Sequence, residues 1–421
     1  MDHTYPIATA TTGNGIRVAV NPDPWVSGVA VNLWYGVGSV LEEPGKTGFA
    51  HLFEHLMFAG SAQVGPGEYA ASLQAIGGGA NATTSFDRTN YFETVPEGGL
   101  ELALWLEAER LSSLMTAIDR PTLDTEREVV KEEKRQRYDN VPYGDAMARL
   151  LGLVFPADHG YAHLPIGSMA DLDAASLTDV QAFFERYYAP SNLILTLSGA
   201  VEPAKGFELV ETYFGHIPPG RAADPPRLPV VPRLTGVPRL TVTGDVPQDV
   251  VYCAWLVPPV ADPRCDHVAL GLQVLAGSMT SRLYRDLVRT ELADSVDAYD
   301  LGLQCGSSLV VATAACAEGV EPDRLTAGLL ESWDAFCTAG PTPAELTRAV
   351  LSEDRAFLAE LAAIEDRADQ ISAAWSLFGD AGEINRHLDT IHAIGADDVT
   401  AAFSEWLRPE YRAQLTYRGA A

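Results

Sequence analysis

The chain has 421 residues, and its 57 Asp and Glu against 29 Lys and Arg give a formal net charge of −28 at pH 7. Proteins that bind nucleic acid or dock on anionic lipid need a basic face, so this balance argues against both classes. The hydrophobic fraction of 47% is typical of a globular chain. Because single cores stop growing near ~250–300 residues, we expect two domains.

The first residues contain neither a cationic segment nor an apolar one, so the sequence predicts no signal peptide. No stretch approaches the ~20 apolar residues that a membrane span requires. The five cysteines are odd in number, widely spaced and without a Cys-x-x-Cys pair. We therefore predict free thiols in a cytoplasmic protein rather than a disulfide framework.

The two halves of the chain repeat one order of predicted elements. In the first half we expect strands at 17–20 and 29–35, a helix at 47–58, a later helix at 180–187 and a strand at 193–197. In the second half the same order is expected at 239–242, 249–255, 266–275, 396–406 and 413–416. A proline-rich linker at 218–233 separates the halves, 1–217 and 234–421. The prediction is an α+β protein of two homologous domains, each a mostly antiparallel sheet packed with helices.

The most informative segment is His51-Leu52-Phe53-Glu54-His55, inside the helix expected at 47–58. At about 100° per residue, His51 and His55 lie ~40° apart, and Glu54 lies ~60° to the other side of His51. Two imidazoles one turn apart can bind Zn²⁺, and a carboxylate beside them can reach a water on the metal. The flanking residues are apolar, whereas a surface helix with scattered histidines would not bury polar groups at such cost. The spacing predicts a metal site, in the reversed form of the His-Glu-x-x-His motif.

A third ligand is expected on the charged helix predicted at 121–135. With Glu126 as the reference, Val130 lies ~40° away, Val129 ~60° to the other side, and Glu133 ~20°. Glu126 and Glu133 therefore share the apolar stripe, where inward carboxylates need a cation. We predict that Glu133 completes the ligand set of one Zn²⁺ per chain, with water as the fourth ligand. We also predict that Glu126 orients a histidine.

Several separated motifs carry a family resemblance. They are His-x-x-Glu-His at 51–55, Gly-Gly-Gly-Ala-Asn-Ala-Thr-Thr at 77–84, Asp-Arg-Thr-Asn-Tyr at 87–91, Glu-Arg-x-Val-Val-x-x-Glu at 126–133, Asp-Asn-Val-Pro-Tyr-Gly at 139–144, Pro-Ile-Gly-Ser at 165–168 and Tyr-Tyr-Ala-Pro-Ser-Asn-Leu at 187–193. Together they resemble the pitrilysin/insulinase group of zinc peptidases, and above all its short two-domain members related to mitochondrial processing peptidase. The resemblance covers nearly the whole chain and is densest in 29–200.

The resemblance implies a zinc-dependent endopeptidase that hydrolyses oligopeptides or unfolded segments. It assigns the zinc to the two histidines and the third ligand already named. Glu54 would be the general base that takes a proton from the attacking water. A peptide substrate would add as a further strand to an edge strand that contains Ala80, Asn81, Ala82 and Thr83.

One stretch of the second half departs from the family pattern. Active members carry an Arg and a Tyr seven residues apart there, and both side chains would bind substrate carbonyls or the oxyanion. Here Asp294 stands at the Tyr position and Leu287 seven residues before it, while Arg289 and Tyr299 lack the expected spacing. A carboxylate repels a developing oxyanion. We therefore expect the zinc-bearing chain of a heterodimer, with a homologous subunit supplying the Arg/Tyr pair; a homodimer is the alternative.

Two other functions stay open. A non-catalytic assembly or scaffold subunit of the same family would fit the missing Tyr, although a scaffold has no use for a buried cluster of histidines and carboxylates. A module that binds basic ligands rests on the net charge alone. The leading expectation is thus a cytoplasmic zinc peptidase that binds peptides, and neither nucleic acid nor membrane.

Overall fold

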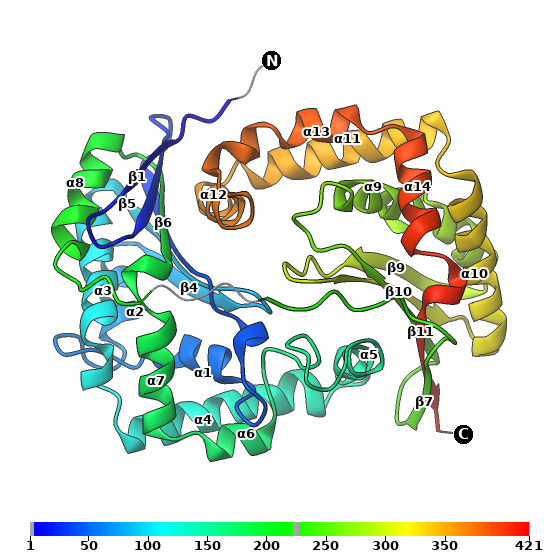
Figure 1. The fold of residues 1–421 in the computed structure, drawn as a ribbon, viewed down its shortest axis with the longest axis horizontal. Coiled ribbons are helices and arrows are strands. Elements are labelled where there is room, and N and C mark those ends of the chain that lie inside the picture. Colours follow the sequence, from blue (N-terminus) through cyan, green and yellow to red (C-terminus); the bar gives the residue numbers. More distant parts are fainter. Residues whose placement is uncertain (1–3, 222–226, 421) are drawn as a thin grey trace. The chain divides into compact units, whose positions relative to one another are not determined.

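The computed structural model describes residues 4–221 and 227–420, which form two compact units (Figure 1). The first unit comprises Met1–Lys134, His163–Pro226 and Leu358–His387; the second comprises Arg135–Ala162, Arg227–Phe357 and Leu388–Ala421. Most residues fall into the unit expected from the division at 1–217 and 234–421. However, 135–162 groups with the later half and 358–387 with the earlier half. Within the predicted linker, 218–221 and 227–233 contain neither helix nor strand, and 222–226 lie outside the described residues.

The first unit contains a six-stranded sheet in the order β1-β2-β6-β3-β5-β4. Its strands are β1 (Ala8–Thr11), β2 (Arg17–Pro22), β3 (Gly28–Tyr35), β4 (Gly79–Thr84), β5 (Thr89–Pro96) and β6 (Leu193–Gly199). Every neighbouring pair is antiparallel except β2 and β6. The segment expected to be an edge strand, β4, does lie at the edge of this sheet.

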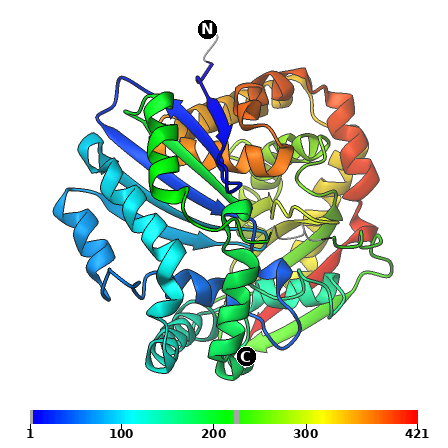
Figure 2. The same ribbon diagram turned by 60° about the vertical axis from the view of Figure 1, so that its left-hand side comes forward.

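Helices cover both faces of the first sheet, and β6 is consequently buried along its whole length. The helices of this unit are α1 (Phe49–Leu56), α2 (Glu68–Ala75), α3 (Leu100–Ser113), α4 (Arg120–Lys134), α6 (Met169–Ala174), α7 (Leu177–Tyr187), α8 (Pro203–Phe214) and α12 (Ile364–Phe378). Figures 1 and 2 show α3 and α8 together on one face. On the other face, Ser372 of α12 donates a hydrogen bond of 3.1 Å to Asn32 Oδ1 of β3, and its Oγ lies 2.8 Å from that of Thr196 in β6.

The second unit contains a five-stranded sheet in the order β7-β11-β8-β10-β9. Its strands are β7 (Arg239–Gly244), β8 (Val250–Val257), β9 (Ala293–Asp300), β10 (Ser308–Cys316) and β11 (Ala413–Gly419). Its helices are α5 (Ala146–Val154), α9 (Cys265–Ala276), α10 (Pro322–Ala339), α14 (Ala396–Trp406) and most of α11 (Pro343–Glu360) and α13 (His387–Ala393). The stacked rings of Trp255 and Trp333, 4.4 Å apart, lie in its apolar core.

The two sheets share one topology. If β2, β6, β3, β5 and β4 are matched with β7, β11, β8, β10 and β9, the strand order is identical. The single parallel pair also falls at the same place, β2 with β6 and β7 with β11. This repeat confirms the predicted α+β fold of two similar, mostly antiparallel domains.

No disulfide joins any two of the five cysteines, all of which are described, so the expected absence of a disulfide framework agrees with the structure. Among the described helices, none combines the length and the apolar character that crossing a bilayer requires.

Candidate metal centre

The helix that carries the two histidines, α1, begins beside one glycine and one buried carboxylate. Gly48, at its N-cap, has a left-handed φ of +93°, and a Cβ there would lie 2.9 Å from the Ile166 carbonyl oxygen. The Glu42 carboxylate accepts hydrogen bonds of 2.8 Å from the backbone N–H groups of Gly48 and Ala50. These amides belong to the end of the helix, where the helix itself offers no acceptor. Complete burial raises the pKa of Glu42 to about 8.

One face of α1 packs into the core of the first unit, and the other carries the predicted metal motif. The buried residues are Phe49, Ala50, Leu52, Phe53 and Leu56. The His51 and His55 side chains are only 12% and 22% exposed. The polar motif therefore lies on a largely covered helix, as its apolar flanks predict.

The two histidines of α1 converge with Glu133 of α4. One ligand atom from each of the three residues lies within 4.8 Å of the others. Glu133 Oε2 is 3.3 Å from His55 Nε2 and 3.7 Å from His51 Nε2. Ligands bound at ~2.1 Å to a tetrahedral Zn²⁺ lie ~3.4 Å apart, so these separations suit a shared ion. Two imidazole nitrogens and one carboxylate oxygen are also a ligand set of catalytic zinc sites, in which water takes the fourth position.

Glu126, predicted to orient a histidine, lies on the other side of the His55 ring. Its Oε2 is 3.9 Å from His55 Nδ1, whereas His55 Nε2 faces Glu133. A carboxylate near the second nitrogen of a ligating histidine restricts the tautomer and the ring orientation. Partial burial raises the pKa of Glu126, and the nearby His55 ring opposes that rise. The structure thus brings Glu126 near His55 Nδ1, and its orienting role stays a prediction.

The apolar stripe of α4 is narrower than the sequence predicts. Leu123 and Val130 are fully buried, whereas Val129 is 45% exposed. The prediction for Val129 is wrong because the stripe is centred on Leu123 and Val130, seven residues apart, and Val129 lies beyond its margin.

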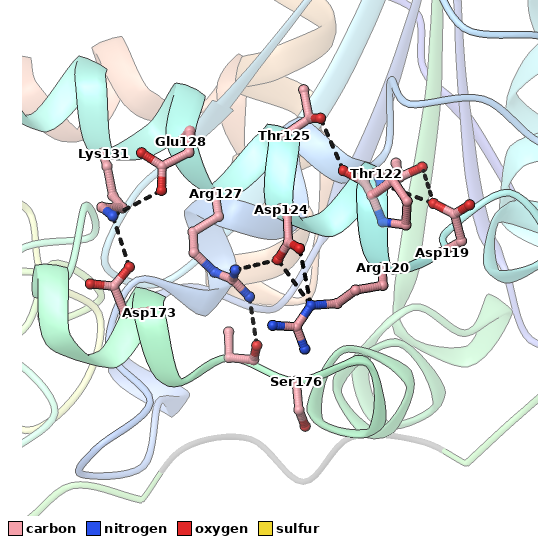
Figure 3. A network of polar contacts seen from close by, with 12 residues as sticks. Asp119, Arg120, Thr122, Asp124, Thr125, Arg127, Glu128, Lys131, Asp173 and Ser176 are labelled. Atoms are coloured by element: carbon pink, nitrogen blue, oxygen red, sulfur yellow. Dashed lines mark hydrogen bonds and ion pairs between the residues drawn. The ribbon is translucent and has the colours of Figure 1, made fainter.

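Ion pairs and hydrogen bonds attach α4 to α6 (Figure 3). Arg127 Nη2 donates a hydrogen bond of 2.7 Å to the carbonyl of Ala175, just after α6. Lys131 Nζ lies 2.9 Å from Glu128 Oε1 and 2.8 Å from Asp173 Oδ1, the latter in α6. These contacts hold the helix that carries Glu133.

Glu54 lies beside the histidine cluster and contacts the edge strand. Its Oε2 accepts a hydrogen bond of 2.5 Å from the hydroxyl of Thr84, the last residue of β4. Partial burial raises the pKa of Glu54; the Thr84 hydroxyl and His55 oppose the rise, and Glu133 adds to it. A carboxyl group with a raised pKa beside a cation site is suited to taking up a proton and returning it.

The four residues predicted to bind substrate lie on β4. This strand ends the sheet, so one of its edges has no neighbouring strand among the described residues. Ala80, Asn81 and Thr83 are exposed, and Ala82 is buried. An open edge of this kind can accept a further strand.

The divergent stretch of the second unit has one buried residue and several exposed polar ones. Leu287 is 1% exposed and belongs to the apolar core. Asp294 is exposed on β9, Arg289 is exposed before it, and Tyr299 is 38% exposed towards the other end of that strand. The polar side chains in this stretch therefore do not reproduce the expected Arg/Tyr spacing.

Sequence reasoning missed two contacts of α1, those with Glu42 and Thr84, although Thr84 belongs to the motif at 77–84. Glu42 lies outside regular structure, and its contact with the start of α1 depends on tertiary folding, so no local pattern reveals it. Thr84 did leave a signal. Side chains alternate along a strand, so Thr84 shares the face of the buried Ala82.

Comparison with known protein families agrees with this architecture. Residues 17–148 match the family described as Insulinase (Peptidase family M16), and residues 174–352 match the one described as Peptidase M16 inactive domain. The chain therefore belongs to peptidase family M16, the pitrilysin/insulinase group that its motifs resemble.

Individual relatives support the same assignment. The chain is 31% identical over 367 residues to the zinc protease PqqE of Helicobacter pylori, an alignment covering 86% of this chain and 81% of that protein. It is 26% identical over 207 residues to the beta subunit of the mitochondrial-processing peptidase of Blastocladiella emersonii, covering 49% and 44%. The crystal structure of a protease from Helicobacter pylori superposes with a TM-score of 0.90 at 26% identity, covering 99% of this chain and 100% of that one.

Proposed function

We propose that this chain is the zinc-binding subunit of an endopeptidase that cleaves oligopeptides or unfolded segments. The observation that carries the proposal is the convergence of His51, His55 and Glu133 beside Glu54 in the first unit. Membership of peptidase family M16 and similarity to a protein named as a zinc protease support it.

The residues of the site have distinct tasks in this reaction. His51, His55 and Glu133 would hold one Zn²⁺, which when bound polarises the scissile carbonyl and lowers the pKa of water. Glu54 takes a proton from the attacking water and delivers it to the departing amine. The peptide lies along the open edge of β4, where main-chain pairing binds it with little dependence on sequence.

We further propose that a homologous subunit completes the site with an Arg/Tyr pair. The support lies in the second unit, where Leu287 is buried in the core and Asp294 places a carboxylate at the Tyr position. A hydroxyl there would donate to the oxyanion, whereas a carboxylate repels it. A heterodimer follows most directly; a homodimer would have to draw the pair from other residues of this chain.

A scaffold subunit is the second candidate. It is favoured by Asp294 and by the match of the second half to a domain described as inactive.

The cytoplasmic location expected from the sequence stays a prediction.

The test measures zinc content and peptide cleavage for the wild-type chain and for Glu54→Gln, each with and without a homologous partner. We expect about one zinc per chain in both variants, because Glu54 is not a ligand. Cleavage should fall by about 100-fold or more in Glu54→Gln, the usual contribution of a general acid–base group. Glu128→Gln, on the outer side of α4, is the matched control and should retain zinc and activity.

The outcomes separate the candidates. Zinc binding and Glu54-dependent cleavage that need the partner support the heterodimer. Full cleavage by the chain alone, with no gain in rate from a partner, would contradict the subunit proposal. A chain without zinc and without turnover in either setting supports the scaffold.

A further inference from the structure

The hydroxyl of Thr84 is the only hydrogen-bond donor to the Glu54 carboxylate among the described residues. The contact joins Glu54 Oε2 to Thr84 Oγ1 at 2.5 Å, within the range of charge-assisted O–H···O⁻ bonds. It connects two elements with separate tasks, since Glu54 belongs to α1 and Thr84 ends β4.

The hydrogen bond has a defined direction. Thr89, opposite Thr84 in the β4–β5 pair, donates its own hydroxyl proton to the carbonyl of Val37 at 2.8 Å. The two threonine hydroxyl oxygens are 3.5 Å apart, too far for a strong bond between them. The proton of Thr84 is therefore directed at Glu54 Oε2, which leaves Oε1 to exchange a proton with the attacking water.

Thr84 is itself held at a rigid point of the sheet. The chain reverses directly after it, with Ser85 N–H bonded to the carbonyl of Arg88 at 2.9 Å. Val40 N–H donates to the carbonyl of Phe86 at 2.8 Å, which anchors the turn to the segment before α1. The space around that anchor is tight, since a Cβ at Gly38 would lie 2.4 Å from the Phe86 carbonyl oxygen.

Charged groups around Glu54 do not provide this orientation. His55 and Arg88 attract the carboxylate and Glu133 repels it, but these forces act at a distance and fix no single rotamer. Arg88 instead donates hydrogen bonds to the carbonyl of Thr83 at 2.9 Å and to Asn90 Oδ1 at 3.2 Å. A directional bond from Thr84 is the contact that selects which carboxylate oxygen faces the reaction.

We propose that Thr84 is a positioning residue for Glu54. This role rests on the proposed peptidase function and goes beyond it, because it couples the strand that binds the substrate to the group that moves the proton. The strand along which a peptide would add thus ends in the residue that orients the base.

The experiment compares Thr84→Val, which removes the hydroxyl but keeps the shape, with Thr84→Ser, which keeps the hydroxyl. The matched control is Thr94→Val in β5, which removes another threonine–glutamate bond of the same sheet, from Thr94 Oγ1 to Glu365 Oε2 at 2.6 Å. All variants are assayed as the full chain with its homologous partner, for kcat, KM and zinc content.

We expect Thr84→Val to lower kcat by about 10- to 100-fold, as losses of orienting partners around metal sites do. KM and zinc content should stay within about twofold of the wild type, and Thr84→Ser should restore most of kcat. Thr94→Val should keep the wild-type kcat. The proposal is overturned if Thr84→Val keeps kcat, or if Thr84→Ser is as slow as Thr84→Val.

A second measurement needs no turnover. A double-mutant cycle on urea unfolding of the metal-free chain combines Thr84→Val with Glu54→Ala. We expect Thr84→Val to lower the folding equilibrium constant at least fivefold more in the wild-type background than in Glu54→Ala. Equal effects in the two backgrounds contradict the contact. If wild-type cleavage does not depend on Glu54, the peptidase function fails and the positioning role fails with it, while the cycle still reports separately on the contact.

Discussion

Five strands of each sheet share one order, but the helices at the same place in the two repeats, α1 and α9, carry different kinds of side chain. Helix α1 follows β3, and α9 follows β8, the matching strand of the second unit. The same Ala-Gly-Ser tripeptide comes at or just after the end of each helix. Aligned on that tripeptide, the residues of α9 at the three motif positions are Val268, Gly271 and Leu272. All three are buried in the second unit. One copy of the helix thus carries the candidate metal ligands, whereas the other copy carries buried packing residues at the same positions.

The difference shows what a polar cluster requires. Imidazoles and carboxylates can lie on a largely covered helix only if a cation or hydrogen bonds compensate for lost water. In the second unit no such compensation is needed, because apolar residues fill the same positions and α14 approaches closely. A Cβ at Gly271 would lie 2.1 Å from the Phe403 ring. The repeat therefore preserves topology, while the chemistry depends on a few side chains.

The largest effect is expected when the two histidines of α1 are replaced by the residues at the matching positions of α9. We expect the double substitution His51→Val and His55→Leu to abolish zinc binding and cleavage, because only Glu133 of the ligand set remains. The metal-free variant should melt no lower than the metal-free wild type, since apolar replacement of buried polar groups is often neutral or stabilising. Metal analysis and calorimetry in EDTA check this. If the variant still binds one zinc per chain, the metal site lies at other residues.

A smaller effect, on the free energy of unfolding, is expected from a substitution in α9. Gly271→Ala should destabilise the protein by about 1–3 kcal/mol, the usual cost of overpacking, because the new methyl group meets Phe403. Gly152→Ala is the matched control, since it also lies within a helix, α5, but has no neighbouring atom within 4 Å of the added Cβ. The control should be neutral or stabilising by up to about 1 kcal/mol. Urea unfolding of both variants measures the difference; equal stabilities would contradict close packing of α9.

The smallest expected effect is that of a substitution at Glu93, one of the charged residues buried in the first unit. The core cluster of the second unit, by contrast, consists of apolar residues and cysteines. Tyr69 Oη contacts both Glu93 and Glu107, and Arg110 Nη2 bonds Glu107 Oε2 at 2.6 Å. Burial, and then the charge of Glu107, raise the pKa of Glu93 well above its ordinary value of 4.5. The folded protein therefore holds a proton that the unfolded chain releases, and stability falls as the pH rises from 4.5 towards the folded-state pKa.

Glu93→Gln should remove this contribution to the pH dependence, because the amide keeps an acceptor for Tyr69 without a charge. The effect is expected to be small, since Arg110 already offsets part of the second negative charge. Melting temperatures of wild type and Glu93→Gln between pH 5 and pH 8 check this. Parallel curves for the two proteins would show that Glu93 does not titrate separately in the folded state.

Local periodicity predicted a large part of the fold and the centre of the site. The helix at 396–406 matches α14 residue for residue, and the strand at 29–35 lies within β3. The same arithmetic placed His51 and His55 on one face of α1 and Glu133 on the apolar stripe of α4, whereas their meeting at one point is a tertiary contact. These predictions succeeded because each depends on residues within one element, where a period of 3.6 or 2 acts directly.

Features that depend on contacts between distant segments escaped prediction. Periodicity shows that α12 is amphipathic but not which sheet it covers, so its place against Asn32 and Thr196 could not be read from sequence. The capping of α1 by Glu42 has the same origin. The exposure of Val129 shows a further limit, because a helix can rotate by part of a turn without changing its pattern.

The exchange of segments 135–162 and 358–387 has a consequence for the engineering of this chain. Neither repeat contains a whole folding unit, because one of the helices that cover each sheet comes from the other repeat. A present-day gene fragment ending at the linker would leave Asn32 and Thr196 without Ser372. The repeats can therefore be replaced or recombined only together with the helices they exchange.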